Sequence, residues 1–225
     1  MPFISLEGLD GAGKSTQIAL IKSYLENIGK EFEYLHFPRF DAPIYGEMIA
    51  RFLRGELGAL ENVDPYVVAM LYAGDRKDAS EMVNKWIAEG KFVLIDRYVY
   101  SNIAYQCAKL ESVKASELKQ WIINLEYEYN KIPKPELSIF LDVPFAFTQK
   151  KLTSTREGDD RDYLKGADDI HESSLELQRK VRQVYLDSAA QDSDFHVIDC
   201  SNGLESMDTP ENIFSRIIKL IEPIL

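Results

Sequence analysis

One glycine-rich segment near the N-terminus constrains the fold of this chain more than any other feature. Residues 8–15 read GLDGAGKS and match the pattern G-x-x-x-x-G-K-[ST], in which glycines let backbone N–H groups converge on phosphate oxygens. The pattern works at a strand-to-helix turn, and here a strand-like run, Phe3–Glu7, precedes it and an amphipathic pattern, Lys14–Ile28, follows it. The segment therefore predicts a site for a nucleoside triphosphate and Mg²⁺. Lys14 would reach the β- and γ-phosphates, and the Ser15 hydroxyl would bind the metal.

The rest of the chain repeats this alternation of short apolar runs and longer amphipathic patterns. The predicted strands are Phe3–Glu7, Glu33–Phe37, Phe92–Asp96, Leu137–Asp142 and His196–Asp199. The predicted helices are Lys14–Ile28, a helix from Pro65 toward Gly90 with Asp64 as its cap, Ser116–Tyr127, Ala146–Leu152, Ser173–Ala190 and Glu211–Ile221. Alternating strands and helices indicate an α/β fold with a parallel sheet and right-handed crossovers. Because several strands are almost continuously apolar, we expect helices on both faces of the sheet.

Composition excludes several classes of protein. The 225 residues are 45% hydrophobic and carry 26 basic against 37 acidic side chains, which gives a net charge of −11. This length and hydrophobicity predict a single domain over residues 1–225. The acidic balance argues against nucleic acid as a partner, and no apolar run reaches the ~18 residues of a membrane span. Two cysteines and an N-terminus without a signal pattern predict a cytoplasmic protein.

The length and the missing motifs favour a small-molecule kinase among phosphate-loop proteins. Guanine-binding switch proteins carry N-K-x-D after a late strand, but Asn84-Lys85 and Asn130-Lys131 lack the aspartate. Motor and helicase ATPases are much longer chains. A nucleotide-binding regulatory module that has lost turnover stays open as an alternative, although the intact Lys14 argues against it.

Charged residues at two strand ends indicate which kind of molecule accepts the phosphoryl group. Asp96 ends the third predicted strand, Arg97 follows it, and Arg39 comes just after the second strand. All three should therefore lie at the edge of the sheet that faces the ligand crevice. A guanidinium offers a planar fork for phosphate, and a phosphate acceptor needs no general base. The arginines therefore favour a monophosphate acceptor. Asp41 keeps a nucleoside hydroxyl acceptor as the alternative, because a carboxylate there could act as a base.

Longer motifs in the same order resemble the thymidylate kinase family. They are the phosphate loop through residue 16, FPR at 37–39, LYAGDR at 71–76, DRYVYSNIAYQ at 96–106, PKPEL at 133–137, FLDV at 140–143 and RKVRQVY at 179–185. The resemblance implies a three-layer P-loop kinase fold with a five-stranded parallel sheet flanked by helices. It also implies a homodimer and the transfer of a phosphoryl group from Mg·ATP to dTMP, a step in dTTP synthesis for DNA replication.

The resemblance further implies a role for individual residues. The dTMP site would contain Asp10 at the sugar 3′-hydroxyl, Phe37, Arg39 and Arg97 at the acceptor phosphate, Tyr72 stacked on the base, Arg76, Ser101 and Asn102 at the thymine, and Tyr105 as the ring that rejects a ribose. Gln106 is a weaker candidate for the base edge. The ATP site would contain Gly8, Leu9, Asp10, Gly11, Ala12, Gly13, Lys14, Ser15 and Thr16.

Residues 153–169 are polar and interrupt the alternation, so they read as a solvated loop or as a lid, and we expect a lid. Gly11 stands where some relatives carry a catalytic arginine, so the resemblance assigns Arg156 and Arg161 of the lid to the ATP phosphates. Residues 162–170 depart from the family pattern, and Glu172 is a weaker candidate for an acid near the metal. The implied catalytic residues are Lys14, Asp96, Arg97 and Arg156, and the implied metal-binding residues are Ser15 and Asp96, the latter directly or through water.

Overall fold

The computed structural model describes residues 2–147, 163–165, 169–170, 174–203 and 206–225. Its centre is a five-stranded parallel sheet with the strand order β2–β3–β1–β4–β5. The strands are β1 (Phe3–Gly8), β2 (Phe32–His36), β3 (Phe92–Asp96), β4 (Leu137–Asp142) and β5 (Phe195–Asp199). The predicted strands are confirmed, and each agrees with its predicted range to within one residue at either end.

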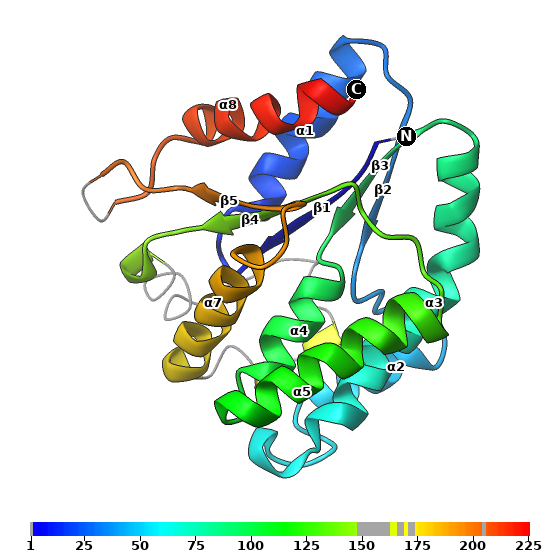
Figure 1. The fold of residues 1–225 in the computed structure, drawn as a ribbon, viewed down its shortest axis with the longest axis vertical. Helices are drawn as coiled ribbons and strands as arrows, with labels where there is room; N and C mark the ends of the chain where they lie inside the picture. Colours follow the sequence, from blue (N-terminus) through cyan, green and yellow to red (C-terminus); the bar gives the residue numbers. More distant parts are fainter. Residues whose placement is uncertain (1, 148–162, 166–168, 171–173, 204–205) are drawn as a thin grey trace.

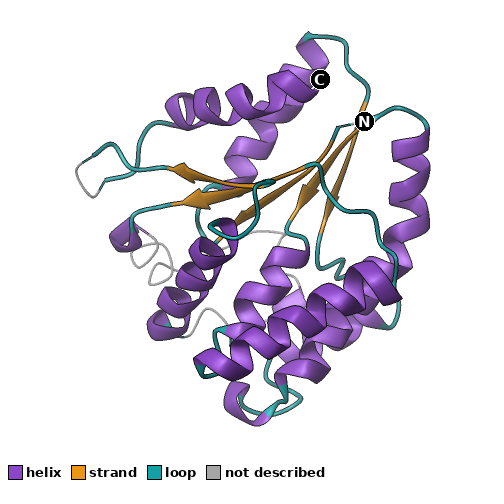
Figure 2. Ribbon diagram, viewed as in Figure 1, coloured by secondary structure: helices purple, strands orange, loops and turns teal. Residues whose placement is uncertain are grey.

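Helices cover both faces of this sheet and make a three-layer fold (Figures 1 and 2). One face carries α1 (Lys14–Asn27) and α8 (Pro210–Ile221). The other face carries α3 (Pro65–Ala88), α4 (Val99–Cys107), α5 (Ser112–Ile123) and α7 (Leu175–Ala189), while α2 (Tyr45–Leu53) packs on α3. Shorter segments are η1 (Leu60–Asn62), the π-helical turn η2 (Asn124–Tyr129) and η4 (Glu222–Ile224). No described helix combines the length and the apolar character that a membrane span requires.

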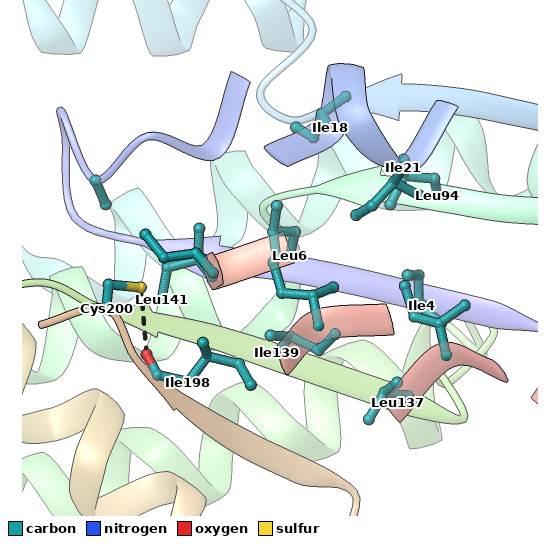
Figure 3. Packing of buried hydrophobic residues seen from close by; sticks show 14 of the residues in the cluster. Ile4, Leu6, Ile18, Ile21, Leu94, Leu137, Ile139, Leu141, Ile198 and Cys200 are labelled. Carbon is teal, nitrogen blue, oxygen red and sulfur yellow. Dashed lines mark hydrogen bonds between the residues drawn. The ribbon is translucent and has the colours of Figure 1, made fainter. Parts of the chain in front are cut away.

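Alternate residues of the central strand pack against the two helical layers. Ile4 and Leu6 of β1 lie in one cluster with Ile18 and Ile21 of α1 (Figure 3). Phe3 lies in a second cluster, with residues of α3, α4 and α5. All five side chains are buried, and full burial of such a side chain stabilises the fold by roughly 1.5–3 kcal/mol. The sheet is therefore packed against helices on both faces, and this packing fixes the position of its carboxyl edge, where the loops that follow the strands begin.

The helices differ from the prediction in three places. The pattern did not predict α2 and α4, which have nine residues each and no side-chain hydrogen bond at their N-caps. The helix expected over Ser116–Tyr127 begins at Ser112 and gives way to η2 after Ile123. Most of the helix expected over Ala146–Leu152 lies outside the described residues.

Candidate active site

The phosphate loop joins β1 to α1 and depends on its glycines. Gly11 and Gly13 have φ values of 76° and 81°, which L side chains rarely adopt. A Cβ atom on Gly8 would lie 3.2 Å from Cβ of Ala12, closer than packing comfortably allows. No side chain of the described residues caps the first turn of α1, so its N–H groups face the loop and favour an anion there.

Lys14 begins α1 and turns back over the loop. Its Nζ donates to the carbonyl oxygens of Gly8 at 3.3 Å and Leu9 at 3.2 Å. The pKa of Lys14 is lowered to about 8, mainly by burial and next by the nearby guanidinium of Arg97. The carboxylate of Asp96 acts in the opposite direction and raises the pKa. A phosphate anion beside this ammonium would remove part of that penalty.

Asp96 ends β3 next to the loop, and its environment fits a magnesium site. Its Oδ1 atom is buried and has no hydrogen-bond partner among the described residues. Among all the residues that the structure describes, no group of three or more His, Cys, Asp and Glu side chains could hold a metal alone. Mg²⁺ is commonly bound by one or two protein oxygens together with substrate phosphates. Asp96 and the Ser15 hydroxyl of α1 match that donor set.

Arg97 connects the end of β3 to the phosphate loop. One Nη atom donates to Oδ1 of Asp10 at 2.6 Å, and the other donates to Oγ of Ser101 at 3.3 Å. The hydroxyl of Tyr105 in α4 donates to the second oxygen of Asp10 at 2.7 Å. Arg97 itself has a φ of 63°, an unusual value for a residue with a side chain. The contacts bring a cation, a carboxylate and an aromatic ring together beside the phosphate loop at the carboxyl end of β3.

Glu7 of β1 is a buried carboxylate that binds Ser101, a hydrogen-bond partner of Arg97. It was not predicted as a site residue. Its Oε2 accepts from the hydroxyls of Ser101 at 2.5 Å and Tyr185 at 3.3 Å, and its Oε1 accepts from the backbone N–H of Tyr98 at 2.9 Å. Burial raises the pKa of Glu7 above its ordinary value. The signal that could have revealed it is an acidic residue inside an otherwise apolar strand, because such a residue needs buried donors.

Arg39 follows β2 and is held by two aspartates of α3. Its Nε donates to Oδ1 of Asp75 at 2.8 Å, and its backbone N–H donates to the other oxygen of Asp75 at 2.9 Å. Its Nη2 donates to Asp78 at 2.6 Å. The guanidinium also lies 5.9 Å from the ring centroid of Phe37, which is buried. Arg39 and Phe37 were predicted as site residues, but the aspartates, which lie 36 and 39 residues from Arg39, were not.

Arg76 and Asn102 meet at one buried carboxylate of the π-helical turn, Glu126, which the sequence analysis also missed. Arg76 donates from Nε at 3.0 Å and also from Nη2 to the same Oε1. Nδ2 of Asn102 donates to that oxygen at 3.3 Å and to the carbonyl of Ala69 at 3.1 Å. Oδ1 of Asn102 is buried and has no hydrogen-bond partner in the part of the chain that the structure describes.

Tyr72 lies one helical turn before Arg76 on α3, as its spacing predicted. Its ring packs against the buried cluster of α2 and α3 that contains Phe52 and Leu53. Burial raises the pKa of its hydroxyl far above the ordinary value. The ring is partly buried and lies on the same face of α3 as Arg76.

Arg156, Arg161 and Glu172 lie outside the described residues, and so does most of the expected lid over 153–169. The described remainder packs on α2. The ring of Tyr163 stacks on Phe40 with 3.7 Å between centroids, and the backbone N–H of Ile170 donates to the carbonyl of Leu53 at 3.0 Å. The described part of the expected lid, together with Ile170 just after it, therefore contacts α2 and Phe40, which follows Arg39.

A family model described as thymidylate kinase matches residues 6–209. The chain belongs to the thymidylate kinase family. A probable thymidylate kinase of Thermococcus kodakarensis is 33% identical over 99% of this chain and 98% of that protein. A thymidylate kinase of Mycobacterium tuberculosis is 31% identical over 84% of this chain and 86% of that protein. The solved structure of the thymidylate kinase of Candida albicans superposes with a TM-score of 0.70 at 24% identity, covers 99% of this chain and 91% of the other, and supports the family's fold.

Proposed function

We propose that this thymidylate kinase family member transfers the γ-phosphoryl group of ATP to the phosphate of dTMP, which yields dTDP for dTTP synthesis. The observation that best supports the acceptor is a pattern of hydrogen-bonding groups on α3 and α4. Asn102 offers the unpartnered acceptor Oδ1, and Gln106 offers Nε2, a buried donor without a partner among the described residues. Arg76 donates to Glu126 from Nε and Nη2, and its guanidinium has three further N–H groups that can donate.

This donor–acceptor–donor pattern complements the edge of thymine. Thymine presents a carbonyl, an N–H and a second carbonyl, whereas cytosine presents an amine, a bare nitrogen and a carbonyl. A buried polar atom without a partner costs free energy, so a ligand that satisfies both amides gains that energy on binding. The family resemblance, which assigns Tyr72 to stack on the base, supports the same site.

The phosphate loop would hold the donor. Residues 8–16 surround the ATP phosphates with backbone N–H groups, and Lys14 neutralises their charge. Ser15 and Asp96 would hold Mg²⁺, which neutralises charge on the β- and γ-phosphates when it is bound. We propose that Arg156 and Arg161 approach the same phosphates from the lid.

The acceptor phosphate would lie between Arg39 and Arg97. Asp10 would accept a hydrogen bond from the sugar 3′-hydroxyl, and Tyr105, held by Asp10, would leave no room for a 2′-hydroxyl. Transfer to a phosphate oxygen requires alignment and charge neutralisation rather than a general base, and these groups supply both. The resemblance also supports a homodimer in the cytoplasm with no nucleic-acid partner, and light scattering of the purified chain would test the dimer.

The test is ADP release from Mg·ATP with dTMP, 5-methyl-dCMP, dUMP, UMP, thymidine and no acceptor. We expect dTMP to exceed 5-methyl-dCMP, which has the same methyl group but a different edge, and dUMP to exceed UMP. Turnover of thymidine instead of dTMP would contradict the phosphate acceptor and favour a nucleoside kinase that uses Asp41. ATP binding without turnover of any acceptor would favour a regulatory module.

A further inference from the structure

Lys109 is a partly buried lysine just beyond the end of α4. Its Nζ lies 4.9 Å from the ring centroid of Phe52 in α2. No acidic side chain among the described residues forms an ion pair with it, and burial lowers the pKa of Lys109 to about 7. An ammonium group in such a place lowers the stability of the fold. A role in the site would explain why this position carries a lysine.

The hydrogen bond of Lys109 goes to a side chain of the proposed base site. Its Nζ donates to Oε1 of Gln106 at 2.8 Å. Gln106 is fully buried, and its Nε2 has no partner in the described part of the chain. The protonated amine of Lys109 only donates, so in that form it requires the oxygen of the amide to face it. The amide nitrogen of Gln106 therefore points away from Lys109.

The orientation of this amide decides what it can bind. Gln106 lies one helical turn after Asn102 on α4, so both amides project from the same side of the helix. A thymine carbonyl needs an N–H donor, and a reversed amide would place oxygen against oxygen. Rotation about the last torsion of a glutamine is soft, so a neighbour has to select one of the two orientations.

We propose that Lys109 is a positioning residue that holds the Gln106 amide with its Nε2 toward a carbonyl of the acceptor base. Lys109 does not touch the nucleotide and acts through Gln106. This inference rests on the proposed function of the acceptor site, and it adds a residue that lies outside the motifs quoted above. The ligand that it selects is a nucleoside monophosphate whose base presents a carbonyl at this position.

Three substitutions separate this role from a purely structural one. Lys109→Met removes the donor, Lys109→Gln can donate or accept and so selects neither orientation, and Lys109→Arg keeps a side chain that only donates. At pH 6, where Lys109 is protonated, we expect the KM for dTMP to rise about 3- to 10-fold in the Met and Gln variants, the effect of one neutral hydrogen bond. We expect kcat and the KM for ATP to change less than about twofold, and Lys109→Arg to restore most of the affinity.

A double-mutant cycle tests whether the effect passes through Gln106. Gln106→Leu alone should raise the KM for dTMP by a similar factor. Adding Lys109→Met to Gln106→Leu should then produce little further change, because no amide is left to orient. Thermal unfolding of each variant shows whether it is folded. If the Met variant does not fold, the cycle is made with Lys109→Gln instead.

The possible outcomes separate this inference from the proposed function. If the unmodified protein does not phosphorylate dTMP, the proposed function fails, and this inference fails with it. If the protein phosphorylates dTMP but the Met and Gln variants keep its KM, only this inference is overturned. It is also overturned if the effects of Lys109→Met and Gln106→Leu add fully, or if kcat and the KM for ATP change as much as the KM for dTMP.

Discussion

Arg97 at the end of β3 and Asp10 in the phosphate loop form an ion pair of 2.6 Å. The pair links the loop proposed for ATP to the arginine proposed for the dTMP phosphate. The second oxygen of Asp10 accepts from Tyr105 at 2.7 Å, so one carboxylate fixes groups from two different elements. A change at Asp10 should therefore disturb the acceptor site more than the donor site.

Asp10→Asn should lower kcat/KM for dTMP about 10- to 100-fold, because hydrogen bonds to a charged group contribute about 1.5–3 kcal/mol. The substitution keeps the shape of the side chain and removes its charge. Steady-state kinetics with dTMP and with its 3′-deoxy analogue checks the result. The analogue lacks the hydroxyl proposed to contact Asp10, so the substitution should lower kcat/KM less for the analogue than for dTMP. An equal loss with both acceptors would assign Asp10 to the support of Arg97 alone.

Asp75→Asn should raise the KM for dTMP several-fold, because Asp75 is the buried partner that orients Arg39. The carboxylate of Asp75 is 1% exposed, whereas that of Asp78, the other partner of Arg39, is 53% exposed. An exposed ion pair contributes little in water, so Asp78→Asn is the matched control and should change the KM less than about twofold. Equal effects of the two substitutions would contradict the orienting role of Asp75.

Arg156→Ala should lower kcat by about 10³–10⁵-fold, the range for an arginine that neutralises charge on a transferring phosphoryl group. The KM for dTMP should change little, because dTMP is proposed to bind through Arg39 and Arg97. Single-turnover kinetics with Mg·ATP and dTMP would separate the chemical step from binding. A rise in KM that equals the loss in kcat would overturn this role for Arg156.

The strands and the phosphate loop could be predicted from the sequence because their signals are local. A continuous apolar run such as Phe92–Asp96 identifies a strand covered on both faces, and the glycines of the loop identify a turn with positive φ values. The helix α4 gave no such signal. It follows β3 directly and has no capping side chain, so its residues become helical through packing rather than through a local boundary motif.

The supporting carboxylates could not be predicted for a different reason. Glu7, Asp75 and Glu126 each serve an arginine, serine or asparagine that is distant in the sequence or on another element, and 94 residues separate Glu7 from Ser101. No spacing rule connects such positions before the fold is known. Residues within a motif could be predicted as site residues, but the buried partners that hold them in place required the three-dimensional arrangement.

ATP binding near pH 8 should take up a proton at Lys14. The pKa of Lys14 is lowered to about 8 by burial and by Arg97, so about half of the free protein lacks this proton at that pH. The phosphate anions favour the charged form, so affinity for ATP should fall as the pH rises above 8. Calorimetry at pH 8 in two buffers of different ionisation enthalpy would measure the uptake. Lys14→Arg, whose guanidinium stays charged, should abolish it, and no dependence on buffer in the unmodified protein would contradict the prediction.

The stability of the unmodified protein relative to Lys109→Gln should rise with pH between about 7 and 10. Burial lowers the pKa of Lys109 from 10.5 to about 7 in the folded state. Between these values the unfolded chain binds one proton more than the folded chain, so a rise in pH favours folding. Below pH 7 both states hold the proton, and the cost of the buried charge is present in full.

Urea unfolding of both proteins at pH 6.5, 8 and 9.5 would measure this difference. Groups other than Lys109 titrate alike in the two proteins, so their contributions cancel when the free energies of unfolding are subtracted. The lost hydrogen bond to Gln106 adds a constant offset but no slope with pH. A difference that stays constant from pH 6.5 to 9.5 would mean that Lys109 keeps its ordinary pKa. The ammonium would then be solvated in the folded protein, and the cost that we infer for this position would be absent.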